Sequence, residues 1–272
     1  MFKIDTHQHF WNYTPEGASW ITPEMGILKN DILPAHVAPI MHHYGLQSCI
    51  AVQSRHTEEE NAFLLAGAAQ HPFIRGVVGW VDLCSRNVWR RLAYYARFPK
   101  LKGFRHLLQD EPDKKMILRP DFQKGIAKLK RYGFTYDIQV GEYQLMDVAK
   151  LAVAHPEQPF VLDHMGNPNI KSKKILEWKR RISRVAQCPN VYCKVSRLAT
   201  ATDREADIRP YLDVVFEAFG PHRLMFGSDW PVCRLSNTFG EILEMMEKYT
   251  ACLSQADRDA FWYGTAEKFY HL

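Results

Sequence analysis

Two histidines near the amino terminus have a spacing that suits chemistry. His7 and His9 flank one glutamine in the segment THQH, at the end of a short apolar run. Residues i and i+2 of a β-strand point to the same face, so a strand here would place the two imidazoles side by side. Such a pair could hold a metal or act on a substrate. Short motifs also match by chance, so the interpretation depends on what the rest of the chain supplies.

Eight apolar runs along the chain have the pattern of parallel strands. Parallel strands buried on both faces read as nearly continuous apolar runs rather than alternating ones. The runs cover residues 2–10, 48–56, 76–83, 101–108, 134–140, 159–166, 191–197 and 223–231. Segments with helical features lie between them. Residues 57–71 open with Thr57 and Glu60 at capping-box spacing, and residues 120–133 begin with proline and end with glycine.

This alternation predicts one closed (β/α)8 barrel, the TIM-barrel fold of the α/β class, with residues 1–272 as a single domain. The alternative is an open doubly wound sheet, but no GxGxxG turn follows the first strand. After the eighth helix, residues 254–272 predict a short C-terminal helical extension. We expect its aromatic side chains to pack across the barrel exterior.

Composition excludes several classes of protein. Apolar residues make up 46% and charged residues 24%, as in ordinary soluble globular proteins. Lys and Arg exceed Asp and Glu by only 35 to 30 and are spread along the chain, so we expect no nucleic-acid partner. The six cysteines form no CxxC pair, and the chain has neither a signal-peptide pattern nor an 18-residue apolar stretch. These features favour a reduced, cytoplasmic protein without a membrane partner, either monomer or homodimer.

Polar residues collect at the carboxyl ends of the predicted strands, where barrels of this kind carry their active sites. They are His7, His9, Gln53, His56, Trp80, Asp82, Arg105, His106, Asp137, Gln139, Asp163, His164, Lys194, Arg197, Ser228 and Asp229. One such residue would mean little, because buried polar groups are common where they are hydrogen-bonded. A ring of them from all eight strands predicts an enzyme.

Three motifs carry a resemblance to a known family. THQH, LDHMG (162–166) and FGSDWP (226–231) resemble the amidohydrolase superfamily, and within it the amidohydrolase-2 group of lactone hydrolases. The similarity continues through VAPIMHHYG, GVVGWVDL, GFRHLLQDEPD and NVYCKVSR and covers essentially the whole chain. The resemblance implies hydrolysis of a small-molecule lactone. A sugar-acid lactone such as L-fuconolactone or L-rhamnonolactone is favoured over the aromatic substrate of the group's pyrone-dicarboxylate lactonase.

The resemblance leaves the metal open. Binuclear members of the superfamily need a carboxylated lysine at the end of strand 4 and a histidine on strand 5. Here strand 4 ends in Arg105 and His106, and residues 134–140 contain no histidine. Two alternatives remain. Either no metal is required, or one divalent ion, with zinc as a candidate, is held by His7, His9 and Asp229.

Residue roles follow as hypotheses. Asp229 is the expected general base, and His164, His7 and His9 are expected to polarise the lactone carbonyl. The expected substrate contacts are Arg105, His106, Gln53, Trp80, Gln139, Lys194 and Arg197. Arg197 departs from the group, whose members generally carry glycine there. The alternative function is a zinc-dependent decarboxylase or hydrolase of an aromatic or dicarboxylic acid, and it predicts an essential metal and the missing strand-5 histidine.

Overall fold

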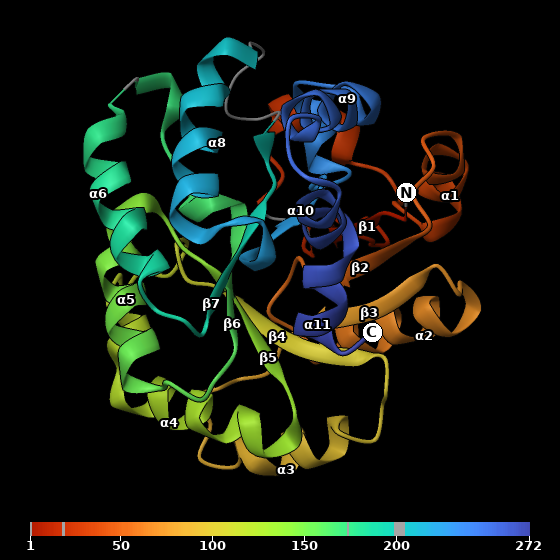
Figure 1. The fold of residues 1–272 in the computed structure, drawn as a ribbon. Helices are drawn as coiled ribbons and strands as arrows, with labels where there is room; N and C mark the ends of the chain where they lie inside the picture. Colours follow the sequence, from red (N-terminus) through yellow and green to blue (C-terminus); the bar gives the residue numbers. More distant parts are fainter. Residues whose placement is uncertain (1, 18–19, 173, 199–204) are drawn as a thin grey trace.

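The computed structural model describes residues 2–17, 20–172, 174–198 and 205–272. Within these residues, eight parallel strands form one sheet in sequence order (Figure 1). The strands are β1 (Ile4–Gln8), β2 (Ser48–Val52), β3 (Ile74–Gly79), β4 (Leu101–Leu107), β5 (Thr135–Gln139), β6 (Phe160–Leu162), β7 (Val191–Val195) and β8 (Leu224–Phe226). The sheet closes where Gln8 pairs with Trp230 and the Asp229 amide donates to the His7 carbonyl at 3.0 Å. The predicted (β/α)8 barrel is confirmed.

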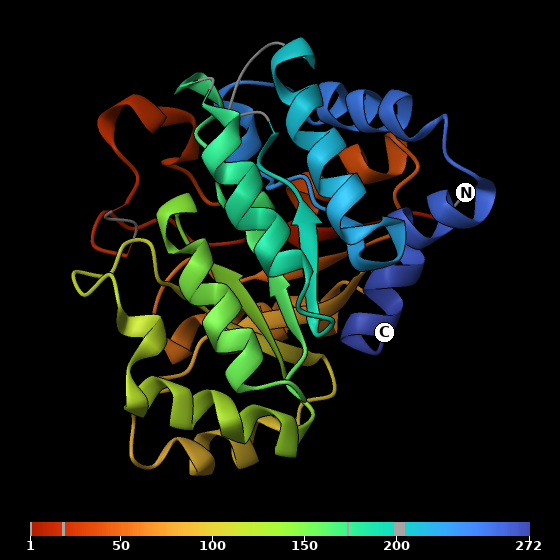
Figure 2. The same cartoon turned by 60° about the vertical axis from the view of Figure 1, so that its left-hand side comes forward.

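Helices surround the strands in both ribbon views (Figures 1 and 2). They are α1 (Pro34–His43), α2 (Glu58–Gln70), α3 (Val88–Tyr95), α4 (Pro120–Leu129), α5 (Leu145–Ala154), α6 (Ile175–Ala186), α8 (Glu205–Phe219) and α9 (Phe239–Thr250). Their sequences explain how they pack. In α6, for example, Trp178, Ile182 and Val185 are buried at helical spacing while the other face is charged. None of the helices in the described residues is long and apolar enough to cross a membrane.

The start of α2 differs from the expected capping box. Thr57 accepts a hydrogen bond from the Glu60 amide at 3.4 Å, as predicted. The Glu60 carboxylate does not return to Thr57. It is buried and accepts hydrogen bonds from the backbone amides of Ser54 and Arg55, at 3.0 and 2.8 Å. These amides lie in the turn after β2, and a buried carboxylate that satisfies several donors stabilises such a turn strongly.

The C-terminal extension comprises α10 (Gln255–Asp259), a π-helical turn (Ala260–Gly264) and α11 (Thr265–Tyr270). Phe261 and Trp262 pack against α8 and β8, as expected for the exterior. Phe269 and Tyr270 differ from the prediction. They join a cluster of apolar side chains from the strands, including Ile4, and so cover the amino-terminal end of the barrel. The reason is that the apolar side chains of this cluster are removed from water by the helix at the end opposite the site.

Candidate active site

A polar cavity of about 100 Å³ lies at the carboxyl ends of the strands. It is lined by His9, Trp20, Ser54, Arg105, Leu107, Gln109, Asp110, Gln139, His164, Arg197, Asp229 and Val232. A neighbouring cavity of about 290 Å³ shares Gln109, His164 and Arg197 with it. The largest cavity described, of about 530 Å³, lies between α1 and the start of α9. It contains none of the polar residues predicted at the strand ends, so the smaller pair of cavities is the candidate site.

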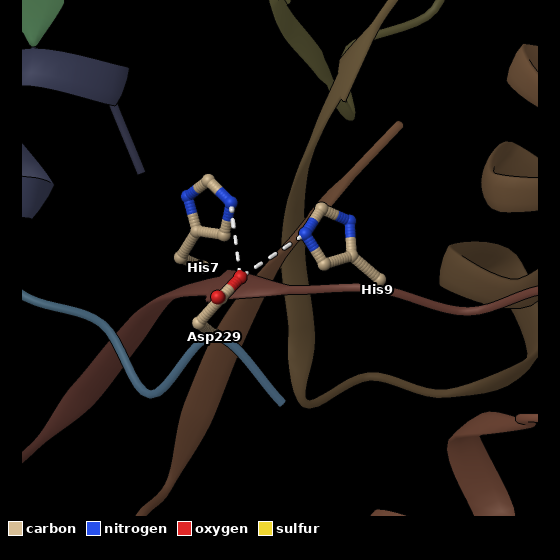
Figure 3. Close-up of side chains that lie close together, drawn as sticks. All are labelled: His7, His9 and Asp229. Atoms are coloured by element: carbon tan, nitrogen blue, oxygen red, sulfur yellow. Dashed lines mark ion pairs between the residues drawn. The ribbon is translucent and has the colours of Figure 1, made fainter. Parts of the chain in front are cut away.

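Figure 3 shows the expected pair of histidines converging with Asp229. The Asp229 Oδ1 atom lies 3.4 Å from His9 Nε2 and 3.8 Å from His7 Nε2. His9 Nδ1 is 2.8 Å from the Val52 carbonyl oxygen, which can only accept, so Nδ1 carries a hydrogen. In the neutral ring, Nε2 then presents its lone pair to a carboxylate. That arrangement requires a proton or a cation between the two groups.

His164 and Asp229 both have strained backbones. Strand β6 ends at Leu162, before the predicted boundary, and His164 has φ of 56° while Asp229 has φ of 61°. Positive φ costs a non-glycine residue roughly 1–3 kcal/mol and is concentrated at functional sites. The turn brings the His164 ring to 4.5 Å from the His7 ring, and His164 Nδ1 lies 2.8 Å from Ser196 Oγ. Local strain therefore coincides with the residues expected to do the chemistry.

Burial sets the charges at the mouth. It lowers the pKa values of His7 and His164 well below the usual value, so both rings are neutral at pH 7. Burial alone would raise the pKa of Asp229, but the hydrogen bond from His9 and the charge of Arg197 hold it below the usual value. The site thus combines the ionised carboxylate of Asp229 with the neutral rings of His7 and His164.

Three of the predicted substrate-binding residues form a buried network around His7. Arg105 Nη1 lies 3.1 Å from both Asp163 Oδ2 and His7 Nε2, and Nη2 lies 3.2 Å from Gln53 Oε1. Lys194 Nζ pairs with Asp137 at 2.5 Å and Asp163 at 3.2 Å. Arg105 reaches the cavity wall, whereas Gln53 and Lys194 are 0% exposed and lie beneath it. For the last two, direct contact with substrate stays a prediction.

His106 and Trp80 lie apart from the cavity lining. Trp80 Nε1 donates to His106 Nδ1 at 3.0 Å, so the hydrogen on His106 Nε2 donates to Glu111 at 2.7 Å. His56 stacks on His106 at 3.9 Å. His56, His106 and Glu111 are close enough together to hold a metal ion. The hydrogen on His106 Nε2, however, leaves that nitrogen no lone pair with which to bind one. The cluster instead fixes the loop after β4.

Sequence reasoning missed Gln109, Asp110 and Glu111. The first two line the cavity, and Glu111 anchors their loop through His106. The available signal was the segment GFRHLLQDEPD, which is specific to the group and contains all three. The sequence could not show that these side chains face the cavity, because loop residues have no strand period from which their direction can be predicted.

Comparison with known proteins decides the family. The family model described as amidohydrolase matches residues 4–272. The chain belongs to the amidohydrolase family. It is 41% identical to an L-fucono-1,5-lactonase of Burkholderia multivorans, over 99% of this chain and 96% of the relative. An L-fucono-1,5-lactonase of Burkholderia ambifaria is 35% identical over 88% and 84%. A crystal structure of an amidohydrolase from Burkholderia multivorans with bound zinc superposes with a TM-score of 0.95, at 41% identity and 100% coverage of both chains.

The residues at the mouth of this amidohydrolase fit one zinc ion. His7, His9 and Asp229 offer two nitrogen donors and one oxygen donor. Donors that share a zinc at about 2.0–2.2 Å lie roughly 3–4 Å apart, and the Asp229 oxygen lies 3.4 Å from His9 Nε2 and 3.8 Å from His7 Nε2. Arg105 contacts the same His7 nitrogen at 3.1 Å. A metal would therefore compete with the guanidinium for the lone pair of His7.

Proposed function

We propose that this chain is a lactonase that opens the ester ring of a sugar-acid lactone, with L-fucono-1,5-lactone as the first candidate. The observation that carries the proposal is the convergence of His7, His9 and Asp229 in a chain 41% identical to an L-fucono-1,5-lactonase. This function agrees with the lactonase predicted from the sequence. The zinc-dependent decarboxylase is not favoured, because β5 (Thr135–Gln139) carries no histidine.

In the proposed mechanism, Asp229 is the general base. Its carboxylate takes a proton from water as the water oxygen attacks the lactone carbonyl. The tetrahedral intermediate then breaks the bond between the carbonyl carbon and the ring oxygen. Asp229 returns the proton to the departing alkoxide, which leaves a hydroxy acid as product. The pKa of Asp229 lies below its usual value, so the carboxylate is ionised at neutral pH, as a general base must be.

His164 is proposed to stabilise the charge on the carbonyl oxygen. Its Nδ1 can accept from the Ser196 hydroxyl at 2.8 Å, which leaves a hydrogen on Nε2. A donor aimed at a developing oxyanion contributes most where water is excluded, and His164 is 4% exposed. A zinc ion bound by His7, His9 and Asp229 would polarise the same oxygen. We propose that this metal is optional, because Arg105 already contacts His7.

Arg197 is proposed to select the substrate. It lines both cavities and donates to Asn167 Oδ1 at 3.3 Å. Its φ of 60° explains why glycine is usual at this position in the group, since glycine adopts that conformation without strain. Gln139 on the same wall offers an amide for sugar hydroxyls. An arginine at this point adds a fixed fork of donors for hydroxyl or carboxylate oxygens.

A panel of aldonolactones assayed with a pH indicator tests the function. Ring opening releases acid, so turnover appears directly as a colour change. We expect hydrolysis of L-fucono-1,5-lactone or a stereochemically related lactone, with a pyrone dicarboxylate lactone as the comparison substrate. Turnover of the aromatic substrate alone, or of no lactone, would contradict the proposal.

A further inference from the structure

The His7 ring lies between two buried cations. Arg105 Nη1 is 3.1 Å from Nε2, and Lys194 Nζ is 3.2 Å from Nδ1. A neutral imidazole has one nitrogen that can accept a hydrogen bond, so only one cation can donate to it at a time. Asp163 Oδ1, an acceptor, also lies 3.5 Å from Nδ1. The tautomer and orientation of His7 therefore depend on how firmly each cation is held against this carboxylate.

Lys194 is held from the interior of the barrel. Its Nζ lies 2.5 Å from Asp137 Oδ2 and 3.2 Å from Asp163 Oδ1, and all three side chains are 0% exposed. An ammonium group has three donors, and Asp137, Asp163 and His7 account for three contacts. Because no solvent reaches the group, displacing one partner shifts Nζ relative to His7.

Asp137 has a second partner at the opposite end of the barrel. The Tyr270 hydroxyl donates to the same oxygen, Oδ2, at 2.8 Å. Tyr270 belongs to α11, which covers the amino-terminal end, and its ring centroid lies 5.7 Å from Lys194 Nζ. One carboxylate oxygen thus joins the C-terminal helix to the lysine that contacts His7.

We propose that Tyr270 is a positioning residue for the reaction. Its hydroxyl fixes Asp137, Asp137 fixes the ammonium group of Lys194, and that group orients His7 at the mouth. The kinetic consequence rests on the proposed lactonase function, whereas the orientation of His7 does not. Tyr270 is absent from the lining of the active-site cavity, so it acts through its partners and not on the substrate.

The variant Tyr270→Phe tests the proposal by removing one oxygen and keeping the ring. Tyr192→Phe is the matched control, because Tyr192 lies at the same end beside Phe269 and its hydroxyl has no hydrogen bond to the described residues. Long-range ¹⁵N–¹H spectra of the imidazoles report the tautomer without turnover, with His7 assigned by the loss of its signals in His7→Gln. We expect the His7 nitrogen shifts to change in Tyr270→Phe and not in Tyr192→Phe. Unchanged His7 shifts in Tyr270→Phe would overturn the proposal.

Kinetics give the second measurement. In Tyr270→Phe, kcat should fall roughly tenfold, the rate equivalent of one hydrogen bond to a charged group, while KM stays near the wild-type value. Tyr192→Phe should retain the wild-type kcat and melting temperature, and Tyr270→Phe should remain folded at the assay temperature. An unchanged kcat, or a loss expressed only in KM, would also overturn the positioning role. If the wild-type enzyme hydrolyses no lactone, the proposed function fails, but the imidazole spectra still decide the role of Tyr270.

Discussion

At the scale of single residues, the site depends on what burial does to charge. A buried carboxylate keeps its charge only where neighbours compensate, and Asp229 has the hydrogen bond from His9 and the charge of Arg197 for this purpose. The neutral state of His164 follows from the same burial. Within the described residues, the paired cations Arg105 and Lys194 balance Asp163 and Asp137 deeper in the barrel. Because these two cations are paired deeper in the barrel, the Asp229 carboxylate at the mouth can interact with a substrate or a cation.

The first prediction concerns Asp229. If it is the general base, Asp229→Asn should lower kcat by about 10²–10⁴, the usual contribution of general base catalysis, while the protein stays folded. Asp82→Asn is the control, because Asp82 also follows a strand but is exposed and absent from the cavity lining. Steady-state kinetics and circular dichroism measure both effects. Near wild-type kcat in a folded Asp229→Asn protein would remove this residue from the mechanism.

The second prediction concerns Arg197. Arg197→Gly should change the ranking of kcat/KM across a lactone panel, because it removes a bidentate donor from the wall of both cavities. The free energy of unfolding should fall by no more than about 1 kcal/mol, since relief of the left-handed backbone offsets lost contacts. Denaturant titration and the panel are measured on the same preparation. A preserved ranking would place Arg197 outside substrate recognition.

The third prediction concerns the metal. Enzyme treated with a chelator and verified metal-free by elemental analysis should keep most of its lactonase activity, because Arg105 occupies the His7 nitrogen that a zinc ion would need. His7→Ala and His9→Ala should each lose most activity. Full loss on chelation, restored by zinc or manganese, would instead show that the two histidines are metal ligands first.

At the scale of elements, the alternation of side chains along a strand explains what the sequence could and could not predict. The runs of apolar residues predicted eight strands and placed their polar ends at one mouth. They could not say which of two neighbours points inward. Arg105 turns into the barrel to Asp163, and His106 turns outward to Glu111. Both neighbours are polar, so the pattern of apolar residues does not show which of them faces the barrel interior.

Glu60 gives a prediction at this scale. It is buried on α2 and accepts from the backbone of Ser54 and Arg55, so it ties the helix to the turn after β2. Glu60→Gln replaces one accepting oxygen with a donor and should lower the free energy of unfolding by about 2–3 kcal/mol. Glu59→Gln, at the exposed neighbouring position, is the control and should change it by less than about 0.5 kcal/mol. Urea titration measures both, and equal effects would contradict the anchoring role.

At the scale of the whole molecule, the barrel interior holds ionisable groups whose protonation differs between the folded and unfolded chain. Burial lowers the pKa of His7 and His164 well below the usual value, and it lowers that of His56 to about 4. Burial has the opposite effect on Asp137 and raises its pKa to about 6. The histidines and the aspartate therefore have opposite effects on how stability changes with pH.

The sign follows from counting protons in each state. Below about pH 6.5 the unfolded chain protonates its histidines while the folded chain keeps these three neutral, so stability falls as the pH falls. Between about pH 6 and 4 the folded chain protonates Asp137 before the unfolded chain does, which offsets part of that loss. The loss of stability from the three histidines is larger than the gain from the one aspartate. We expect the free energy of unfolding to be about 3 kcal/mol lower at pH 5.5 than at pH 7.5.

Urea titration at the two pH values measures this difference in the free energy of unfolding. Single variants show how much of the difference each histidine contributes. His56→Gln should remove part of the drop, because it deletes one of the rings whose pKa is lowered in the folded chain. His222→Gln is the control, since the His222 side chain is 71% exposed. A free energy of unfolding that is the same at both pH values would mean that the interior histidines accept protons in the folded state. In that case the neutral imidazoles on which the proposed mechanism relies would not exist at mildly acidic pH.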